Sequence, residues 1–263
     1  MTERQLPPSS AMRRQPIFPA GSSGIIVTRL TDTSLLTVLR DVAARYFPEP
    51  ADAYAAMDAD RYRQRVAEAQ DAINALSIGQ RVVQDLRSDL QAVLATDRIL
   101  VQSSVYLRAT RPKVTGVQEN VGWHRESFYG PDMEYSVNVW MPIANVNPDN
   151  MLRYIPDSHL IPDDQIVVVS EPDPTMPRYS AGHRIGLLYA PKRIIGGVDL
   201  SAHRPFAVAL GEVAIFSGQL IHGAAQNRSD SIRFSIDFRT IAKANLREQK
   251  DHFASGRKYF EEI

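Results

Sequence analysis

The stretch GEVAIFSGQLIHG, residues 211–223, decides the fold predicted for this chain. It opens with Gly211 and Glu212, which have the character of a turn. The apolar run 213–216 that follows suits a strand in the core of a β protein. His222 comes after this strand and is flanked by small residues that leave room for a ligand. The same pattern fits a core histidine whose hydrogen bonds are satisfied within the protein, so His222 alone does not identify a site.

A second stretch, GWHRE at residues 122–126, places a histidine and a carboxylate two positions apart. On a β-strand, His124 and Glu126 point to the same face. Together with His222 they would offer two imidazoles and one carboxylate to one face of an iron ion. Three coordination positions would stay open, as in non-heme Fe(II) oxygenases. The pair alone is weak evidence, because a loop histidine beside a surface glutamate is common in a chain with six histidines and 30 acidic residues.

The composition argues against several classes of protein. Lys+Arg and Asp+Glu both number 30, so no basic excess exists to attract nucleic acid or an anionic membrane surface. The absence of cysteine excludes disulfides, iron–sulfur clusters and cysteine nucleophiles, and it disfavours a zinc deaminase. No apolar run approaches the roughly 20 residues that span a bilayer, and residues 1–24 lack the apolar segment of a secretory signal. We therefore expect a soluble protein of the cytoplasm, with 1–24 as a flexible arm.

The rest of the chain, 25–263, is expected to form one domain. Helical spacing dominates about 31–96, strand-like runs separated by turn residues follow over about 98–241, and a closing helix is expected at about 245–263. This order predicts a mainly β fold with helices: a double-stranded β-helix (jelly-roll or cupin-like barrel) buttressed by N-terminal helices. The expected helices are 35–46, 51–74 and 78–96, and the expected strands are 24–30, 99–108, 135–141, 152–155, 165–170, 185–189, 206–210, 213–216 and 232–241.

The strand-like run 232–239 alternates strictly between apolar and polar residues, with two arginines on its polar face. Turn residues before it suggest that it pairs antiparallel with the segment of His222. Arg233, eleven residues after His222, could bind the far carboxylate of a dicarboxylate through two hydrogen bonds, with the Ser235 hydroxyl as a further donor. The alternative is a polar stripe that faces solvent, which suits Arg239 better than Arg233.

With these residues in place, the chain resembles the phytanoyl-CoA dioxygenase-like group of Fe(II)/2-oxoglutarate-dependent oxygenases. The segment VWMPI at 139–143 resembles the central strand of that family, and NMLRYIPDSH at 150–159 resembles its NGxLxxxPGSH segment. Residues 211–233 resemble its GDxxxFxxxxxHxxxxNxSxxxR segment. The match covers roughly 98–241 and is far more specific than the histidine–glutamate pair.

The resemblance implies a role for each candidate residue. His124, Glu126 and His222 would bind Fe(II), and Arg233 would hold the distal carboxylate of 2-oxoglutarate. Ser235 matches the serine of an RxS pattern in related oxygenases. The implied reaction consumes O₂ and 2-oxoglutarate, releases succinate and CO₂, and hydroxylates a small-molecule metabolite.

The sequence departs from the family pattern at two positions. The family usually has aspartate where Glu126 stands, although some members of the wider superfamily use glutamate. A carboxylate at this position argues against a halogenase, which would need the position free for halide. Asp157 replaces the usual glycine before Ser158, a change expected to affect a turn rather than chemistry, and His159 is expected to be structural.

Two other functions stay open from the sequence. The same cofactors could support desaturation, cyclisation or epimerisation, and a non-catalytic cupin-like barrel could bind a small molecule without turnover. Residues 176–205 carry a formal charge of about +4, which indicates a lid over an anionic substrate or simply a solvated basic loop.

Overall fold

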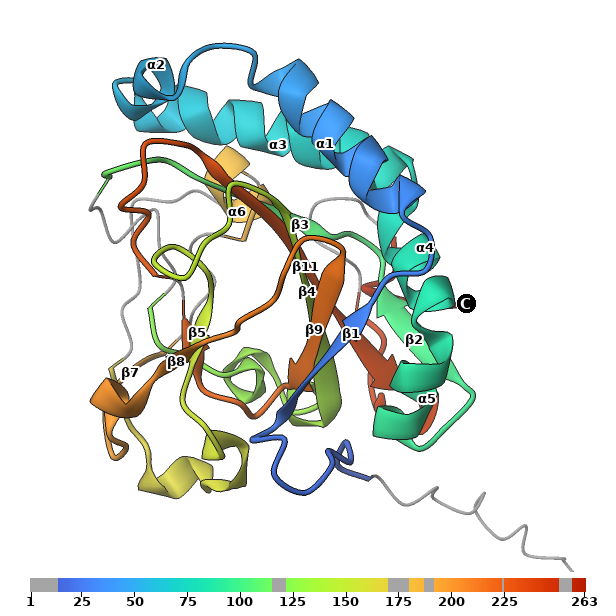
Figure 1. The fold of residues 1–263 in the computed structure, drawn as a ribbon. Coiled ribbons are helices and arrows are strands. Elements are labelled where there is room, and N and C mark those ends of the chain that lie inside the picture. The colour runs from blue at the N-terminus through green and yellow to red at the C-terminus, as the bar shows by residue number, and fades with distance from the viewer. Residues whose placement is uncertain (1–13, 115–121, 170–179, 187–191, 224, 251–256) are drawn as a thin grey trace, which may run out of the picture.

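The computed structural model describes residues 14–114, 122–169, 180–186, 192–223, 225–250 and 257–263. Within them, strands form a large sheet in the order β1-β9-β4-β11-β2-β12, with β3 also paired to β11 (Figure 1). A smaller sheet, β10-β5-β8, and the pair β6-β7 lie beside it. The strands are β1 Ile25–Arg29, β2 Ile99–Gln102, β3 Tyr106–Thr110, β4 Ser136–Ala144, β5 Arg153–Tyr154, β6 Val167–Val169, β7 Arg193–Gly196, β8 Arg204–Pro205, β9 Glu212–Ser217, β10 His222–Gly223, β11 Arg233–Ala242 and β12 Phe260–Glu262.

The helices between β1 and β2 cover one face of the large sheet, as Figure 1 shows in blue and cyan. Together with the sheet they give the expected mainly β architecture of a jelly roll buttressed by N-terminal helices. None of the described helices is both long enough and apolar enough to cross a bilayer. The helices are α1 Ser34–Tyr46, α2 Ala51–Ala55, α3 Ala59–Ala75, α4 Ile78–Asp85, α5 Arg87–Leu94 and, later in the chain, α6 Ala181–Arg184.

The N-terminal helices follow the sequence pattern with two exceptions. The helix expected at 51–74 is two helices, α2 and α3, because the backbone is extended at Asp58. The Asp58 side chain caps α3 by accepting hydrogen bonds from the backbone N–H groups of Asp60 and Arg61. The single helix expected at 78–96 is wrong: Leu86 leaves the helical conformation, and the chain turns from α4 into α5. Leu86 is itself buried. Both helices bury apolar side chains, Val82 and Val83 from α4 and Leu90 and Val93 from α5.

The main core lies between the helices and strand β11. Phe234, Ile236 and Phe238 on one face of β11 pack with residues of α1 and α3, and neighbouring β4 contributes Val137 and Val139 to the same cluster. Successive residues of a strand point to opposite faces, so the polar residues between these apolar ones point the other way.

The polar face of β11 does not face solvent, which corrects the alternative that suited Arg239. Arg233, Ser235 and Arg239 are all buried, and Arg239 is only 7% exposed. Alternation identifies the two faces of a strand but not what covers each face. Here the polar face lines a cavity, and His222 of the smaller sheet lines the same cavity.

Two expectations for the C-terminal part of the chain, a strand pairing and a closing helix, are wrong for the described residues. The segments of His222 and Arg233 do not pair with each other: β10 pairs with β5, whereas β11 pairs with β2, β3 and β4. The closing helix 245–263 is also wrong. A short 3₁₀ turn, Lys243–Asn245, is followed after the gap by β12. Strand β12 pairs with the edge of β2 and buries Phe260, so this edge is not left unpaired.

Several other boundaries differ from the prediction. The strand expected at 99–108 is two strands, β2 and β3. The strand expected at 206–210 is not formed, and pairing in this region is confined to the preceding strand β8. Of 185–189, Ile185 and Gly186 form a turn, and the rest lies outside the described residues. The described part of the arm is attached rather than free, since the Ile17 N–H donates to the Val93 carbonyl; residues 1–13 lie outside the described residues.

We predict that Phe238→Ala lowers the free energy of unfolding by about 3–5 kcal/mol, because the fully buried ring leaves a cavity beneath the helices. Urea unfolding followed by circular dichroism and fluorescence measures the change. Leu160→Ala is the control, since Leu160 is 72% exposed. Equal effects of the two changes would contradict this location of the core, and one common transition for both probes would support the expected single domain 25–263.

Candidate active site

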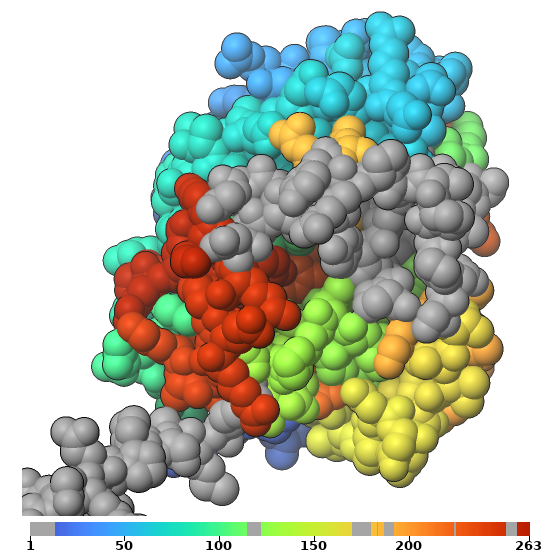
Figure 2. Space-filling view, turned by 180° about the vertical axis from the view of Figure 1, so that it is seen from behind, coloured from blue at the N-terminus to red at the C-terminus, as the bar shows by residue number. Residues whose placement is uncertain are grey.

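A cavity of about 510 Å³ opens between the polar face of the large sheet and the smaller sheet. Its size lies within the range of small-molecule sites. On the face seen in Figure 2, C-terminal residues in red lie beside residues near 130 in light green, and the surface is hollowed between them. Both regions contribute lining residues, among them Tyr129, Met133 and Tyr259.

The three metal-ligand candidates reach this cavity from loops held by backbone hydrogen bonds. His124 and His222 form an isolated antiparallel bridge in which each backbone N–H donates to the other residue's carbonyl at 3.0 Å. Glu126 begins a 3₁₀ turn, and its N–H donates to the Gly218 carbonyl at 2.7 Å. The expectation that His124 and Glu126 share a face of a regular strand is therefore wrong. The side chains of His124 and Glu126 converge because the chain turns at Glu126, two residues after the bridging residue His124.

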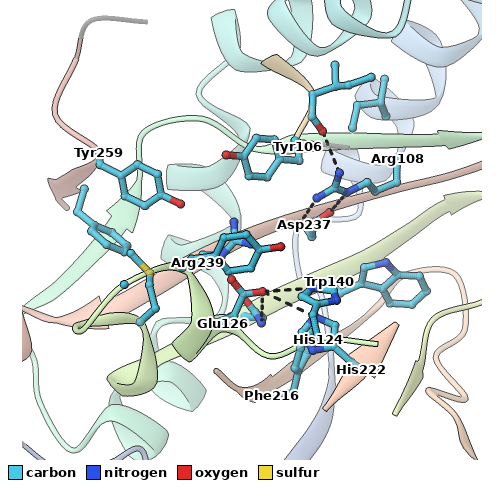
Figure 3. Close-up of a pocket in the computed structure, with 18 of the residues that line it drawn as sticks. Tyr106, Arg108, His124, Glu126, Trp140, Phe216, His222, Asp237, Arg239 and Tyr259 are labelled. Carbon is cyan, nitrogen blue, oxygen red and sulfur yellow. Dashed lines mark hydrogen bonds and ion pairs between the residues drawn. The ribbon is translucent and has the colours of Figure 1, made fainter. Parts of the chain in front are cut away.

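The side chains of these three residues meet at one point of the cavity (Figure 3). The Nε2 atoms of His124 and His222 lie 3.9 and 3.7 Å from Oε1 of Glu126. The possible donor atoms all lie within 4.8 Å of one another, and all three residues are buried. This cluster could hold one metal ion.

The histidines present their Nε2 lone pairs to the cluster. Nδ1 of His124 lies 2.7 Å from the Gly122 carbonyl, and Nδ1 of His222 lies 2.9 Å from the Leu220 carbonyl. A carbonyl only accepts, so each Nδ1 carries the proton and Nε2 is free to bind a metal. Burial and the nearby His222 lower the pKa of His124 to about 3, and burial also lowers the pKa of His222. Both imidazoles are therefore neutral at physiological pH.

Glu126 is ionised despite its burial. Burial by itself raises the pKa of this carboxyl, but the adjacent Arg239 outweighs it and brings the pKa to about 2. Nε of Arg239 donates to Oε2 at 2.5 Å, and Nδ2 of Asn138 donates to Oε1 at 3.3 Å. Two neutral imidazoles and one carboxylate form the donor set that the site offers.

Arg125, between the two ligand candidates, points away from the metal cluster and braces its loop. The buried guanidinium donates to the backbone carbonyls of Ser158 and Ile161 and forms an ion pair with Asp163 at 2.7 Å. No motif in the sequence predicts this role for Arg125. The one indication is its position between His124 and Glu126.

Arg233 supplies a positive charge without a carboxylate partner among the described residues. Its NH2 group donates to the Thr110 hydroxyl at 2.5 Å, and NH1 lies 3.4 Å from the Ser235 hydroxyl. Its buried Nε has no hydrogen-bond partner in the described part of the chain. Burial and the like charge of Arg108 lower the pKa of Arg233 to about 10, so it stays cationic at neutral pH.

The other charges of the cavity floor are already paired. Arg108 binds both oxygens of Asp237, at 2.6 and 3.1 Å, and also donates to the Ile185 carbonyl. Arg239 is held by Glu126. Neither ion pair was predicted from the sequence. Asp237 and Arg239 lie on the same face of the strand as Arg233, but their partners Arg108 and Glu126 are distant in the chain.

The segment that resembles the NGxLxxxPGSH pattern lines the cavity with Leu152 and supports the site through its later residues. Asp157 adopts a left-handed conformation with φ of 61°, which explains why glycine is usual at this position. The buried Ser158 hydroxyl accepts from the Ile221 N–H, next to His222. His159 lies against Phe18 and is not among the residues that line the cavity, in line with its expected structural role.

The described part of 176–205 contributes Ile185 and Gly186 to the cavity. Arg184 points elsewhere and forms an ion pair with Asp71. His203 stacks on Trp123 at 5.6 Å between ring centroids. Residues 176–179 and 187–191 lie outside the described residues, so an anionic substrate stays a prediction from the sequence.

A family model described as phytanoyl-CoA dioxygenase (PhyH) matches residues 26–235. No curated protein matches the sequence. Among solved structures, EvdO2 from Micromonospora carbonacea var. aurantiaca is 15% identical, covers 91% of this chain and 97% of its own, and has a TM-score of 0.59. AviO1 from Streptomyces viridochromogenes Tue57 is 18% identical over 84% of this chain and 90% of its own, with a TM-score of 0.52. EctD from S. alaskensis, solved with 2-oxoglutarate and 5-hydroxyectoine, is 17% identical over 90% of this chain and 80% of its own, with a TM-score of 0.50. At these identities the structures are similar to this chain in fold.

We predict that Arg125→Met lowers the affinity for Co(II) about 10- to 100-fold, because the loop that carries His124 and Glu126 loses its brace. Isothermal titration calorimetry measures the affinity. The control is Arg153→Met, which removes an arginine that is only partly buried and whose side chain bonds Pro148 and His203. Co(II) affinity that is the same in both variants would contradict the bracing role.

Proposed function

The chain belongs to the phytanoyl-CoA dioxygenase (PhyH) family, and from that premise we propose that it hydroxylates a small-molecule metabolite at an unactivated C–H bond. Membership of this family makes the protein an Fe(II)- and 2-oxoglutarate-dependent oxygenase. One observation carries the proposal: the buried cluster of two histidines and a glutamate shares a cavity with Arg233, which has no carboxylate partner among the described residues. A metal site and a carboxylate site thus face the same enclosed space.

We assign His124, Glu126 and His222 as the iron ligands. Their donors are two neutral imidazole nitrogens and a carboxylate oxygen, which is the facial set that non-heme Fe(II) oxygenases use. The Nδ1 hydrogen bonds to Gly122 and Leu220 orient the rings, as carbonyl groups commonly do for metal-bound histidines. When bound, the iron supplies the activation of O₂ that no protein side chain supplies.

We assign Arg233 and Ser235 to the distal carboxylate of 2-oxoglutarate. The buried guanidinium has an unused Nε–H, and its positive charge has no partner among the described residues. An unpaired buried cation is unfavourable, so an incoming carboxylate would remove a desolvation penalty as it binds. The Ser235 hydroxyl, next to NH1, would add a further hydrogen bond.

The remaining cavity walls would place the substrate and exclude water. Tyr106, Tyr129 and Trp140 line the space around the metal cluster, and Leu246 and Tyr259 come from the C-terminal region. These apolar and aromatic surfaces lower the local dielectric and strengthen the polar contacts beside them.

The donor set favours hydroxylation over halogenation. Glu126 would fill the ligand position that a halide needs, so no bound halide would be available for transfer to the substrate. The balanced reaction is R–H + 2-oxoglutarate + O₂ → R–OH + succinate + CO₂. Turnover against a panel of metabolites with analysis of product mass tests it: a gain of one oxygen supports hydroxylation, whereas a loss of two hydrogens or an unchanged mass would favour desaturation, cyclisation or epimerisation.

We predict that His124→Ala and His222→Ala each abolish Fe(II) retention and succinate formation while the fold persists. Each change removes one of two neutral imidazole donors. Metal analysis after gel filtration, succinate assay and circular dichroism provide the measurements. His159→Ala is the control, because His159 lies outside the cavity. Full activity in either ligand variant would remove the metal assignment.

We predict that Arg233→Ala strongly raises the KM for 2-oxoglutarate, since the lost charge-assisted contacts are worth on the order of 2–5 kcal/mol. Steady-state succinate formation at varied 2-oxoglutarate measures the KM. Arg111→Met is the matched control: Arg111 is equally buried and adjacent to Thr110, but its guanidinium donates to the carbonyls of Tyr54 and Met57. If both variants changed the KM equally, the carboxylate site would lie elsewhere.

A further inference from the structure

The two oxygens of Glu126 have different surroundings. Oε1 faces the Nε2 atoms of both histidines and accepts a hydrogen bond from Asn138. Oε2 points the other way and accepts from Nε of Arg239 at 2.5 Å (Figure 3). The carboxylate therefore offers one oxygen to the metal cluster, and the protein already uses the other.

Arg239 is itself fixed in place, so it can act as an anchor. Its backbone N–H and its NH1 group both donate to Oε1 of Gln102 at 3.2 Å. The guanidinium carbon lies 5.6 and 5.5 Å from the ring centroids of Tyr106 and Tyr129, within the range of cation–π contacts. The side chain is buried and its pKa lies well above the ordinary value, because Glu126 and nearby tyrosines outweigh the effect of burial.

We propose that Arg239 is a positioning residue: its Nε–H holds Oε2 of Glu126, so that this glutamate binds the metal through Oε1 alone. The proposal rests on the assignment of His124, Glu126 and His222 as iron ligands. Arg239 touches neither substrate nor 2-oxoglutarate in this role and acts only through Glu126.

The glutamate is the reason that such an anchor is needed. It has one more rotatable bond than the aspartate usual in this family, so its carboxylate has more freedom to turn. A carboxylate that turned would be able to bind a metal through both oxygens. Bound through one oxygen, the protein uses three of six positions and leaves three for 2-oxoglutarate, which takes two, and O₂. Bound through both, it would leave two, and none would remain for O₂ once 2-oxoglutarate is present.

The contacts also separate this role from two alternatives. Arg239 is not free to hold the distal carboxylate of 2-oxoglutarate, because Glu126 and Gln102 already accept from its Nε and NH1 and Tyr259 is hydrogen-bonded to its side chain. The second alternative is that Arg239 serves only as a countercharge to the buried Glu126, and this alternative predicts different effects of substitutions. Any cation would then suffice, whereas the positioning role needs a donor at the place of Nε.

Three substitutions distinguish these roles. Arg239→Met removes both the charge and the donor. Arg239→Lys keeps the charge but has a carbon where Nε stood, and Arg239→Gln places an amide N–H at that position without a charge. Nitric oxide, an O₂ surrogate that binds ferrous iron, reports the open position through the electron paramagnetic resonance signal of its iron adduct. The signal is measured anaerobically with Fe(II), with and without 2-oxoglutarate.

We expect the wild type and Arg239→Gln to give the nitric oxide signal with 2-oxoglutarate present. Arg239→Met and Arg239→Lys should give it without 2-oxoglutarate and lose most of it when 2-oxoglutarate is added. In steady state, the methionine variant should lose about 10- to 100-fold in kcat, with a much smaller change in the KM for 2-oxoglutarate than Arg233→Ala causes. Arg111→Met is the control for the signal, since it removes another buried arginine, whose guanidinium donates to the carbonyls of Tyr54 and Met57 and which does not line the cavity.

Each result then points to one conclusion. A full signal in Arg239→Met with 2-oxoglutarate overturns the proposal, as does a pattern in which lysine restores the signal and glutamine does not. If the methionine variant fails to fold, Arg239→Lys decides in its place, because its charge preserves the pairing of Glu126. A wild-type signal that is present without 2-oxoglutarate and lost when it is added would also overturn the proposal. No wild-type signal with iron under either condition would instead refute the metal site of the proposed function.

Discussion

The central strand β11 is the constraint on which the rest of the structure depends. It is hydrogen-bonded to β4 along one edge and to β2 and β3 along the other, so both of its edges are paired. Its apolar face, with Phe238 fully buried, holds the helices onto the sheet. Its polar face carries the charges of the cavity. One ten-residue strand therefore builds both the core and the floor of the active site, and an error of one residue in its register would exchange the two.

Burial of that polar face sets strict requirements on charge. Isolated charges are very unfavourable away from water, so each needs a partner or a ligand. Arg108 is paired with Asp237 and Arg239 with Glu126, which leaves the cation of Arg233 for a ligand. The same arrangement keeps Glu126 ionised while the histidines stay neutral, because Arg239 acts on the carboxyl from close contact whereas burial dominates the imidazoles. A site with these protonation states accepts a divalent cation without first releasing protons from its ligands.

The metal cluster is assembled from the bridging residue His124, the 3₁₀ turn at Glu126 and the two-residue strand β10, so its rigidity depends on a few hydrogen bonds. The backbone bridge between His124 and His222 sets the spacing of the two rings. The bond from Glu126 N–H to Gly218 turns the carboxylate toward them. Arg125 then ties the first loop to the Ser158 region, which in turn supports Ile221 beside His222. Ser158 of the NGxLxxxPGSH-like segment thus supports the site, whereas Leu152 of the same segment lines the cavity.

Sequence alone determined the identity and spacing of the candidate residues: the histidine–glutamate pair, His222 after an apolar strand, and Arg233 eleven residues later on an alternating strand. It also predicted the N-terminal helices and the mainly β architecture, because amphipathic spacing is a local property of the chain. Tertiary structure decided what covers each face. It buried Arg239 against Glu126, where the sequence suggested a solvent-facing stripe. It also joined β12 to the sheet, where the sequence suggested a helix. The physical reason is that the periodicity of a segment reports its own two faces, whereas the partner of a face depends on residues more than a hundred positions away.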